Sequence, residues 1–566
     1  MLHLKTALAG SSRKDIEERL TGRFYTPHAI ADRLAGFSAD AGCPETVCDP
    51  FCGDGRLVLA WLRHQSSRGP IRRLRQISLW DCDADAVREA AGRVRAELAL
   101  MEADRVVVDA RHGDTFLRED TGRFDLVITN PPWEQLKPDS RDGVGDGSRY
   151  RAEIQDYAGA LAARFPDAAT SRRRSIGGYT INLARAGAMA AARLTADGGV
   201  LLIVLPSTIF ADQVSGNFRR HFFSALAVSQ IDFYPAEARL FRGVDQSFVT
   251  VAARRGRGSP AFTLRRFRPD LSVADIREHV PAGQDEPLPL AVGGAEHELI
   301  RQVRGRHPQA RWLEDDLRFG LRLGRELDET RIAEAFAPAG GGVPFVKGRD
   351  ISRFAMVARD LPRIDPALRR IPPSALEARV AWRDVSRPSQ KRRVHACIVP
   401  PGMVTGNSLG IARFRSPLPH LLETFMAVMN SIVFEVQVRG RLATNHVSQG
   451  VVRHCAIPFG LFECADGRAR LAELAREGAD PRHAAALEVM VARAYGLGRD
   501  EFASLLRPFD KLPADDPAIF QPAPRCRPWW SLTTTCLPRP RRLLNPLAAS
   551  STLRTQPRAL PTCCGQ

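Results

Sequence analysis

The segment Asn130-Pro131-Pro132-Trp133 carries the most specific chemistry in the chain, because its groups suit an amino group on a flat ring. The side-chain oxygen of Asn130 and the carbonyl of Pro131 can both accept hydrogen bonds from an NH2 group. The Trp133 ring can stack on a heterocycle, and the two prolines stiffen the turn before a substrate arrives. The apolar run at residues 124–129 places this turn at the end of a strand. The pattern predicts a site that modifies an exocyclic amino group.

A glycine turn lies upstream of this segment, in Asp49-Pro50-Phe51-Cys52-Gly53-Asp54-Gly55. It follows a short β-rich run and precedes a helical pattern that starts near Leu57. A strand–loop–helix unit with two glycines lets a ligand approach the backbone closely. No Gly-Lys-Ser/Thr follows the turn, so the spacing is not that of a P-loop and a phosphate ligand is not favoured.

Acidic residues follow the next two apolar runs. Asp81 ends the run at residues 77–80 and suits the hydroxyls of a ribose, whereas Asp83 or Asp85 suits the cap of the following helix. The run at residues 105–110 leads to Asp114, which can accept a hydrogen bond from an adenine amino group with Phe116 against the ring.

Strands alternate with helical stretches throughout residues 45–255, and a fifth apolar strand is expected at residues 199–205. This alternation predicts an α/β fold with a parallel sheet covered on both faces. The site is then expected at the carboxyl ends of the strands.

The ordered motifs resemble those of the N6-adenine DNA methyltransferases of type II restriction–modification systems. The F-x-T-P motif that opens this family is matched by Phe24-Tyr25-Thr26-Pro27, and the glycine turn, the acidic residues and the Asn-Pro-Pro-aromatic segment follow in the family's order. Cys48, Cys52 and Trp80 depart from the commoner residues. The resemblance implies a Rossmann-like domain that uses S-adenosylmethionine as its cofactor.

The resemblance also assigns residues to roles. The implied catalytic residues are Asn130, Pro131, Pro132 and Trp133. The implied cofactor-binding residues are Phe24, Tyr25, Thr26, Pro27, Asp49, Phe51, Gly53, Gly55, Asp81, Asp114 and Phe116. The target adenine would leave the duplex and stack on Trp133. A later aromatic residue would cover its other face, and Phe210, Phe222 and Phe223 are candidates that could equally belong to the core.

The whole chain divides into four expected parts. Residues 1–255 form the catalytic domain, 256–345 a connecting region or small subdomain, 346–520 a mixed α+β target-recognition domain, and 521–566 a disordered basic tail. The net charge of +17 suits a polyanion, here double-stranded DNA. Residues 137–178 form a polar insertion that either closes over DNA or is a solvated loop.

A polar cluster in the third part has side chains of the kinds that read bases in the major groove or hold phosphates. Its members are Arg439, Arg441, Asn445, His446, Ser448 and Gln449.

Other classes of protein are disfavoured. No apolar run approaches the roughly 20 residues that cross a membrane, no signal peptide is evident, and the expected location is the cytoplasm. No metal-ligand spacing occurs, and the 11 cysteines have the irregular spacing of free thiols. No Pro-Cys pair is present for methylation of cytosine C5. The chain is expected to be a stand-alone modification enzyme with a separately encoded restriction endonuclease as its partner.

Three alternatives stay open at this stage. N4-cytosine DNA methylation uses similar hydrogen-bond acceptors. Methylation of RNA or of a protein glutamine also uses Asn-Pro-Pro-aromatic sites, although the long region after residue 255 disfavours it. A DNA-binding module without enzymatic activity would need no cofactor turn.

Overall fold

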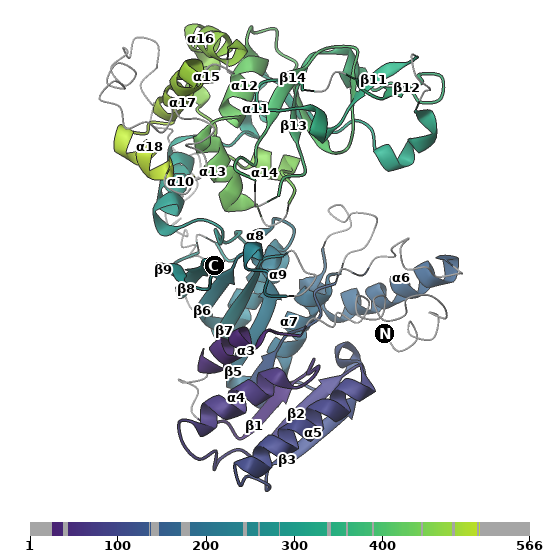
Figure 1. The fold of residues 1–566 in the computed structure, drawn as a ribbon, viewed down its shortest axis with the longest axis vertical. Coiled ribbons are helices and arrows are strands. Elements are labelled where there is room, and N and C mark those ends of the chain that lie inside the picture. The colour runs from purple at the N-terminus through teal and green to yellow at the C-terminus, as the bar shows by residue number, and fades with distance from the viewer. Residues whose placement is uncertain are drawn as a thin grey trace, which may run out of the picture.

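The computed structural model describes residues 25–37, 43–134, 136, 147–170, 181–241, 246–258, 261–281, 283–336, 341–357, 360–387, 390–442, 445–477, 481–506 and 509. These residues form two lobes, one running from α3 to β9 and the other from α10 to α18 (Figure 1). The predicted cofactor residue Phe24 and the predicted tail at 521–566 lie outside the described residues.

A nine-stranded sheet with the order β3-β2-β1-β4-β5-β7-β6-β8-β9 forms the centre of the first lobe. Its strands are β1 (Thr46–Asp49), β2 (Gln76–Asp81), β3 (Val107–His112), β4 (Phe124–Thr129), β5 (Thr195–Pro206), β6 (Leu226–Tyr234), β7 (Phe248–Arg255), β8 (Phe262–Phe267) and β9 (Val273–His279). Because β8 and β9 belong to this sheet, it continues beyond residue 255, where the catalytic domain was expected to end.

The prediction of a wholly parallel sheet is wrong at β7. Strands β1 to β5 run parallel to one another, but β7 runs antiparallel to both β5 and β6. The segment between β6 and β7 contains no crossover helix among its described residues, and a parallel return would need one. The strand β9 is likewise antiparallel to β8.

Helices cover both faces of the sheet (Figure 1). The helices α3 (His28–Gly36), α4 (Arg56–Ser66) and α5 (Ala84–Leu100) lie on one face. The helices α6 (Gly147–Arg164), α7 (Leu183–Leu194) and α9 (Gly216–Ala225) lie on the other, and the short helix α8 (Thr208–Ala211) follows β5. Side chains of β4 alternate between the two faces of the sheet. Leu126 and Ile128 lie in the core on the face of α3, α4 and α5, and Val127 lies in the core on the face of α6, α7 and α9.

The helix α6 rules out the solvated-loop alternative for residues 147–164 of the insertion at 137–178. One face of this helix carries Ile154, Ala158 and Leu161, which are buried in the core on the second face of the sheet. A helix with a buried stripe needs an apolar surface to pack on, and the sheet supplies it. Residues 137–146 and 171–178 of the insertion lie outside the described residues.

The second lobe combines two small sheets with a group of helices. The four-stranded sheet contains β10 (Leu321–Gly324), β16 (Leu409–Phe414), β13 (Arg379–Arg383) and β14 (Ala396–Val399), and the three-stranded sheet contains β12 (Arg363–Ile364), β11 (Val343–Val346) and β15 (Val404–Thr405). The helices are α10 (Gly294–Arg306), α11 (Trp312–Asp315), α12 (Leu421–Met429), α13 (Ile432–Arg441), α14 (Gln449–Arg453), α15 (Phe459–Glu463), α16 (Ala465–Arg476), α17 (Pro481–Ala494) and α18 (Arg499–Leu506). This lobe is mixed α+β.

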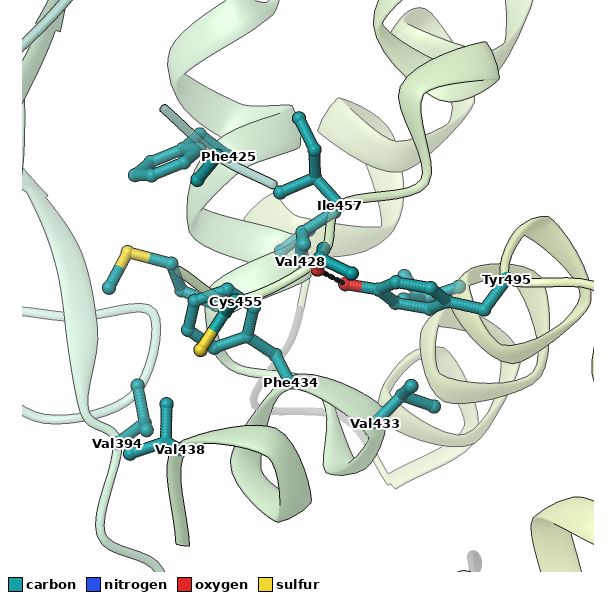
Figure 2. Close-up of a cluster of buried hydrophobic side chains, with 14 of the residues drawn as sticks. Val394, Phe425, Val428, Val433, Phe434, Val438, Cys455, Ile457 and Tyr495 are labelled. Carbon is teal, nitrogen blue, oxygen red and sulfur yellow. Dashed lines mark hydrogen bonds between the residues drawn. The ribbon is translucent and has the colours of Figure 1, made fainter. Parts of the chain in front are cut away.

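The helices of the second lobe share one large apolar core, part of which is shown in Figure 2. Phe425, Val428 and Phe434 lie within it, and the Tyr495 hydroxyl donates to the Ala456 carbonyl at 2.8 Å. In the described part of the chain, no single helix has the length and apolarity to cross a membrane. The bent pair α12–α13 reaches that length only in combination, across a 62° break.

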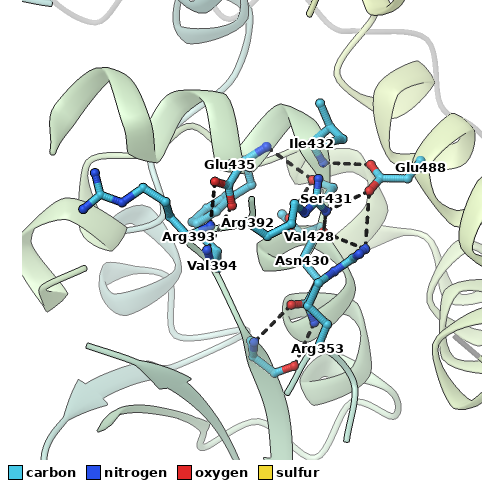
Figure 3. Close-up of polar contacts among 12 residues, drawn as sticks. Arg353, Arg392, Arg393, Val394, Val428, Asn430, Ser431, Ile432, Glu435 and Glu488 are labelled. Atoms are coloured by element: carbon cyan, nitrogen blue, oxygen red, sulfur yellow. Dashed lines mark hydrogen bonds and ion pairs between the residues drawn. The ribbon is translucent and has the colours of Figure 1, made fainter. Parts of the chain in front are cut away.

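Two buried carboxylates join helices of the second lobe to the segment that precedes β14 (Figure 3). Glu488 accepts from the Ile432 amide at 2.8 Å and from Arg392 Nη2 at 3.1 Å. Glu435 accepts from the amides of Arg393 and Val394 at 2.8 and 2.9 Å. Both carboxylates are therefore held by several donors, as a buried charge requires.

Candidate active site

An open pocket of about 780 Å³ lies where the glycine turn, the carboxyl ends of β2 and β4, and the residues after β3 meet. Its lining is Tyr25, Thr26, Asp49, Phe51, Cys52, Gly53, Asp54, Arg56, Leu57, Asp81, Cys82, Ala86, Asp114, Thr115, Phe116, Asn130 and Pro132. Ten of the residues that the sequence assigned to the site are in this lining: Tyr25, Thr26, Asp49, Phe51, Gly53, Asp81, Asp114, Phe116, Asn130 and Pro132. The predicted residues Pro27, Gly55, Pro131 and Trp133 are outside it.

The two glycines of the turn serve different purposes. Gly53 has a φ of 49°, and a Cβ there would lie 3.0 Å from the Tyr25 ring, so this position needs both the left-handed backbone and the missing side chain. Gly55 has a φ of 78° at the start of α4, and a Cβ there would lie 3.0 Å from Ala90 Cβ on α5. Gly55 therefore permits close packing of the turn on α5 rather than contact with a ligand.

Asp81 fixes the shape of the turn from the neighbouring strand. Its Oδ2 accepts from the Gly53 amide at 2.9 Å, and its Oδ1 accepts from the Asp83 amide at 3.0 Å. Asp83 caps α5 by accepting from the Asp85 and Ala86 amides. As expected, Asp81 lines the pocket and a later aspartate, Asp83, caps the helix.

Asp49 is a buried carboxyl at the base of the pocket. Burial raises its pKa to about 7, even though its Oδ1 accepts from the Thr129 hydroxyl at 2.7 Å and the Phe51 amide at 3.2 Å, which oppose the rise. The side chain is 1% exposed. Near neutral pH, Asp49 is therefore about half protonated.

Asp114 and two phenylalanines form the far wall of the pocket. Asp114 caps a short 3-10 helix, and its Oδ1 accepts from the Phe116 amide at 2.9 Å. The rings of Phe116 and Phe51 are 5.2 Å apart. The two rings are inclined by 47° and form an apolar wall beside a carboxylate.

Asn130 is tied to the N-terminal segment that crosses the pocket. Its Nδ2 donates to the Thr26 hydroxyl at 3.1 Å, which sets the orientation of the amide. The Thr26 carbonyl accepts from Arg56 Nη1 at 2.8 Å, and Arg56 is paired with Asp54 at 2.7 Å. A continuous chain of contacts thus runs from the glycine turn to the amide of Asn130.

The other half of the Asn-Pro-Pro-Trp segment packs against the protein. The Trp133 ring lies 4.9 Å from the Phe241 ring and 6.0 Å from the Phe248 ring, and its side chain is partly buried. Pro131 packs on α7, where a Cβ added at Gly187 would lie 2.4 Å from Pro131 Cβ.

The later aromatic residues proposed to cover the substrate do not reach the pocket. Phe210, Phe222 and Phe223 are buried and pack on one another with ring separations of 5.5 to 5.9 Å. They belong to the core beneath α8 and α9, so of the two interpretations of these residues the core interpretation is correct.

Several residues of the site carried no local sequence signal. Arg56 lines the pocket, Tyr157 donates to Asp114, and Gly187 supports Pro131. Tyr157 and Gly187 lie far along the chain from their partners, so only folding brings them there. Arg56 directly follows the glycine turn, so its place in the sequence could have suggested that it lines the pocket.

The donor and acceptor set of the pocket fits a nucleoside with a charged tail better than a metal ion. Asp81 and Asp114 suit hydroxyl and amino groups, while Phe51 and Phe116 suit a purine ring. No group of three or more His, Cys, Asp or Glu side chains in the described part of the chain is arranged to hold a metal. Burial raises the pKa of the Cys52 thiol, which stays protonated as a neutral part of the wall.

Comparison with known proteins agrees with this geometry. The family model for N-6 DNA Methylase matches residues 14–160. No curated protein matches the chain. Among solved structures, this chain is similar to a cryo-EM structure of a DrdV–DNA complex. The alignment covers 84% of this chain and 59% of that chain, with 10% sequence identity and a TM-score of 0.52. This likeness shows a shared fold.

Two further solved structures are similar at lower scores. The type IIG restriction endonuclease BpuSI aligns over 88% of this chain and 66% of its own, with 14% identity and a TM-score of 0.40. A nuclease-deletion mutant of the Type ISP restriction-modification enzyme LlaGI, in complex with a DNA substrate mimic, aligns over 83% and 55%, with 10% identity and a TM-score of 0.48. This chain thus spans between 55% and 66% of the length of the three structures. The match to the N-6 DNA Methylase model thus covers residues 14–160, and the cofactor of this part of the chain is S-adenosylmethionine.

Proposed function

We propose that this protein is a sequence-specific DNA adenine N6-methyltransferase, acting as the modification enzyme of a restriction–modification system. The observation that carries the proposal is that Asn130 and Pro132 line the same pocket as the glycine turn and its acidic residues. This supports the proposal, because methyl transfer requires an amino-group acceptor beside a nucleoside site.

The cofactor, when bound, supplies an electrophilic methyl group on sulfur. Asp81 is assigned to the ribose hydroxyls and Asp114 to the adenine amino group, with Phe51 and Phe116 against the ring. The N-terminal segment at Tyr25 and Thr26 lies over the remaining part of the pocket.

The target adenine presents an amino group whose lone pair is delocalised into its ring. Acceptance of its hydrogens by the Asn130 side-chain oxygen and the Pro131 carbonyl would favour a more tetrahedral nitrogen. That nitrogen would take the methyl group as the carbon–sulfur bond breaks, and would then release one proton to water. The Asn130 Nδ2 donates to the Thr26 hydroxyl, and its Oδ1 is the atom assigned to the substrate amino group. The base leaves the duplex to reach these groups, and Trp133, backed by Phe241, is assigned to stack on it.

The second lobe is assigned to target recognition, and the expected domain divisions near residues 255 and 345 remain predictions. The net charge of +17 supports a nucleic-acid partner. Within the predicted base-reading cluster, however, three members have structural partners. Arg439 pairs with Glu435 at 2.7 Å, His446 pairs with Asp384 at 2.7 Å, and Ser448 caps α14. A separately encoded restriction endonuclease is proposed as the partner that makes modification necessary.

The function is tested with wild type and the Asn130→Ala variant, incubated with S-adenosylmethionine and duplex DNA. Wild type is expected to produce N6-methyladenine in a nucleoside mass analysis. Asn130→Ala is expected to lose about 100-fold or more in methyl transfer, as when a preorganised polar group is removed from an active site, while cofactor affinity by calorimetry changes little. Asn217→Ala on α9, whose Nδ2 donates to the Asp167 carbonyl at 3.3 Å away from the pocket, is the matched control and should keep full activity.

The possible outcomes separate the alternatives. If the product is N4-methylcytosine, the target base is cytosine and the proposed adenine specificity is wrong. If RNA or protein is methylated and DNA is not, the proposed DNA substrate is wrong. Absence of S-adenosylmethionine binding in wild type would reject the enzymatic function altogether and leave a DNA-binding module.

A further inference from the structure

The helix α6 reaches the pocket through a polar contact of Tyr157. The Tyr157 hydroxyl donates to Asp114 Oδ2 at 2.6 Å, while Asp114 Oδ1 accepts from the Phe116 amide at 2.9 Å. Both oxygens of the carboxylate are thus held, so its plane is fixed relative to the Phe116 ring.

The position of Tyr157 is itself fixed by packing. Ile154, Ala158 and Leu161 of α6 share an apolar core with Phe116, and Phe165 after the helix lies 6.2 Å from Phe116, ring to ring. The helix therefore holds Tyr157 over Asp114 through several contacts around the polar one.

The Tyr157 hydroxyl acts only as a donor toward this carboxylate. Burial raises its pKa, and the negative charge of Asp114 raises it further, so the hydroxyl keeps its proton. A hydroxyl that donates to a carboxylate stabilises the charged form of that carboxylate. Each carboxylate oxygen can accept more than one hydrogen bond, so an aligned Asp114 can also accept from an amino group on a ring against Phe116.

We propose that Tyr157 is a positioning residue that gives the cofactor site its specificity for a 6-amino purine, by aligning the Asp114 carboxylate. This rests on the proposed function, in which Asp114 meets the adenine of S-adenosylmethionine. The 6-oxo group of a purine such as hypoxanthine accepts hydrogen bonds, whereas the 6-amino group of adenine donates them. A fixed Asp114 carboxylate would face the 6-oxo oxygen with no hydrogen between the two acceptors, which disfavours binding of the 6-oxo purine. Without Tyr157 the carboxylate can turn away, and the distinction between the two purines weakens.

The test measures the affinity of the full chain for S-adenosylhomocysteine and for S-inosylhomocysteine, its 6-oxo counterpart, by calorimetry. Wild type is expected to prefer the adenine compound by about 100-fold, as sites built around a buried polar pair do. Tyr157→Phe is expected to weaken adenine binding by about tenfold, the size of one hydrogen bond to a charged group, and to leave inosine binding nearly unchanged. The preference therefore falls by about tenfold.

Two further variants keep the result interpretable. In Asp114→Ala, adding Tyr157→Phe should weaken binding no further, because the two residues act through one contact. Tyr495→Phe removes a buried hydroxyl that donates at 2.8 Å in the second lobe, and it should leave both affinities unchanged.

The outcomes distinguish the inference from the proposed function. If wild type binds neither compound, the proposed function fails and the inference fails with it. If wild type prefers adenine but Tyr157→Phe keeps that preference, or loses affinity equally for both compounds, Tyr157 has only a structural role and the inference is overturned while the proposed function stands.

Discussion

At the scale of single residues, the proposed function depends on the orientation of the Asn130 amide. An asparagine carries an acceptor and a donor at nearly equal positions, and only its partners decide which faces the substrate. Here the donor side of Asn130 is used by the Thr26 hydroxyl at 3.1 Å. The Thr26 carbonyl is in turn held by Arg56 at 2.8 Å, so the hydroxyl has little freedom to move.

Replacing the Thr26 hydroxyl tests this orientation. Thr26→Val keeps the shape but removes the acceptor, so kcat should fall by about five- to tenfold, as expected for one hydrogen bond of about 1 kcal/mol. Thr26→Ser keeps the hydroxyl and should retain kcat near that of wild type. Steady-state kinetics of DNA methylation compare the two, and equal rates for Val and Ser would show that the hydroxyl does not orient Asn130.

Asp49 predicts a pH dependence of stability. The unfolded carboxyl releases its proton near pH 4, whereas in the folded protein the pKa of Asp49 is raised to about 7. The folded state therefore binds more protons between these values, and its free energy of unfolding falls as the pH rises through this window. Asp49→Asn cannot titrate, so its stability relative to wild type should increase by about 4 kcal/mol from pH 4 to pH 7 and stay level above. Urea unfolding at several pH values measures this difference, and a constant difference across the window would contradict the shift.

At the scale of secondary-structure elements, α7 sets the position of the Asn-Pro-Pro-Trp turn. A Cβ at Gly187 would lie 2.4 Å from Pro131 Cβ and 3.5 Å from Phe51 Cε2. The helix and the turn can be this close only because a glycine stands between them.

Gly187→Ala is therefore expected to displace the turn. The overpacking should cost about 1–3 kcal/mol of stability, and a shift of the catalytic groups by about 1 Å should lower kcat by about 100-fold. Gly159→Ala on α6 is the matched control, because a Cβ there meets nothing within 4 Å and a helix gains from alanine. Thermal unfolding and methylation rates check both variants, and wild-type activity in Gly187→Ala would show that the turn can move without harm.

At the scale of the whole molecule, two lobes with separate cores meet between α8 and α14 (Figure 1). Gln213, which follows α8, donates to the Gly450 carbonyl at 3.3 Å and lies 3.1 Å from His454 Nδ1. The cofactor pocket lies wholly in the first lobe, whereas the buried ion pairs of Glu488 lie wholly in the second (Figure 3).

This separation predicts that the second lobe can be destabilised without damage to the cofactor site. Glu488→Ala leaves Arg392 as an uncompensated buried charge and should cost the second lobe about 3–5 kcal/mol. Scanning calorimetry should show a lower unfolding temperature for the second lobe. The affinity for S-adenosylmethionine, measured below that temperature, should be unchanged. The exposed pair of Glu298 and Arg301 offers the control, since Glu298→Ala should change neither quantity. Loss of cofactor binding in Glu488→Ala at low temperature would show that the lobes fold as one unit.

The sequence alone determined the order of the motifs and the chemistry of the pocket, because each motif is a strand end or a turn whose character is set by adjacent residues. Asp49, Gly53, Asp81 and Asn130 could be assigned in this way, and all four line one pocket. The apolar residues Val87, Ala91, Val94 and Leu98, spaced three or four apart in the sequence, form a buried stripe on α5.

The tertiary structure decided the contacts between distant parts of the chain. The pairs Tyr157–Asp114, Asn130–Thr26 and Gly187–Pro131 join residues separated by tens of positions, so no local periodicity indicates them. The direction of β7 was missed, and the choice between a core role and a substrate-covering role for Phe210 stayed open, for a related reason. The alternation of apolar residues in a strand does not show whether it runs parallel or antiparallel to its neighbour. The presence of a phenylalanine likewise does not show whether its ring contacts a ligand or packs in the core. Only the packing of the whole chain separates these alternatives.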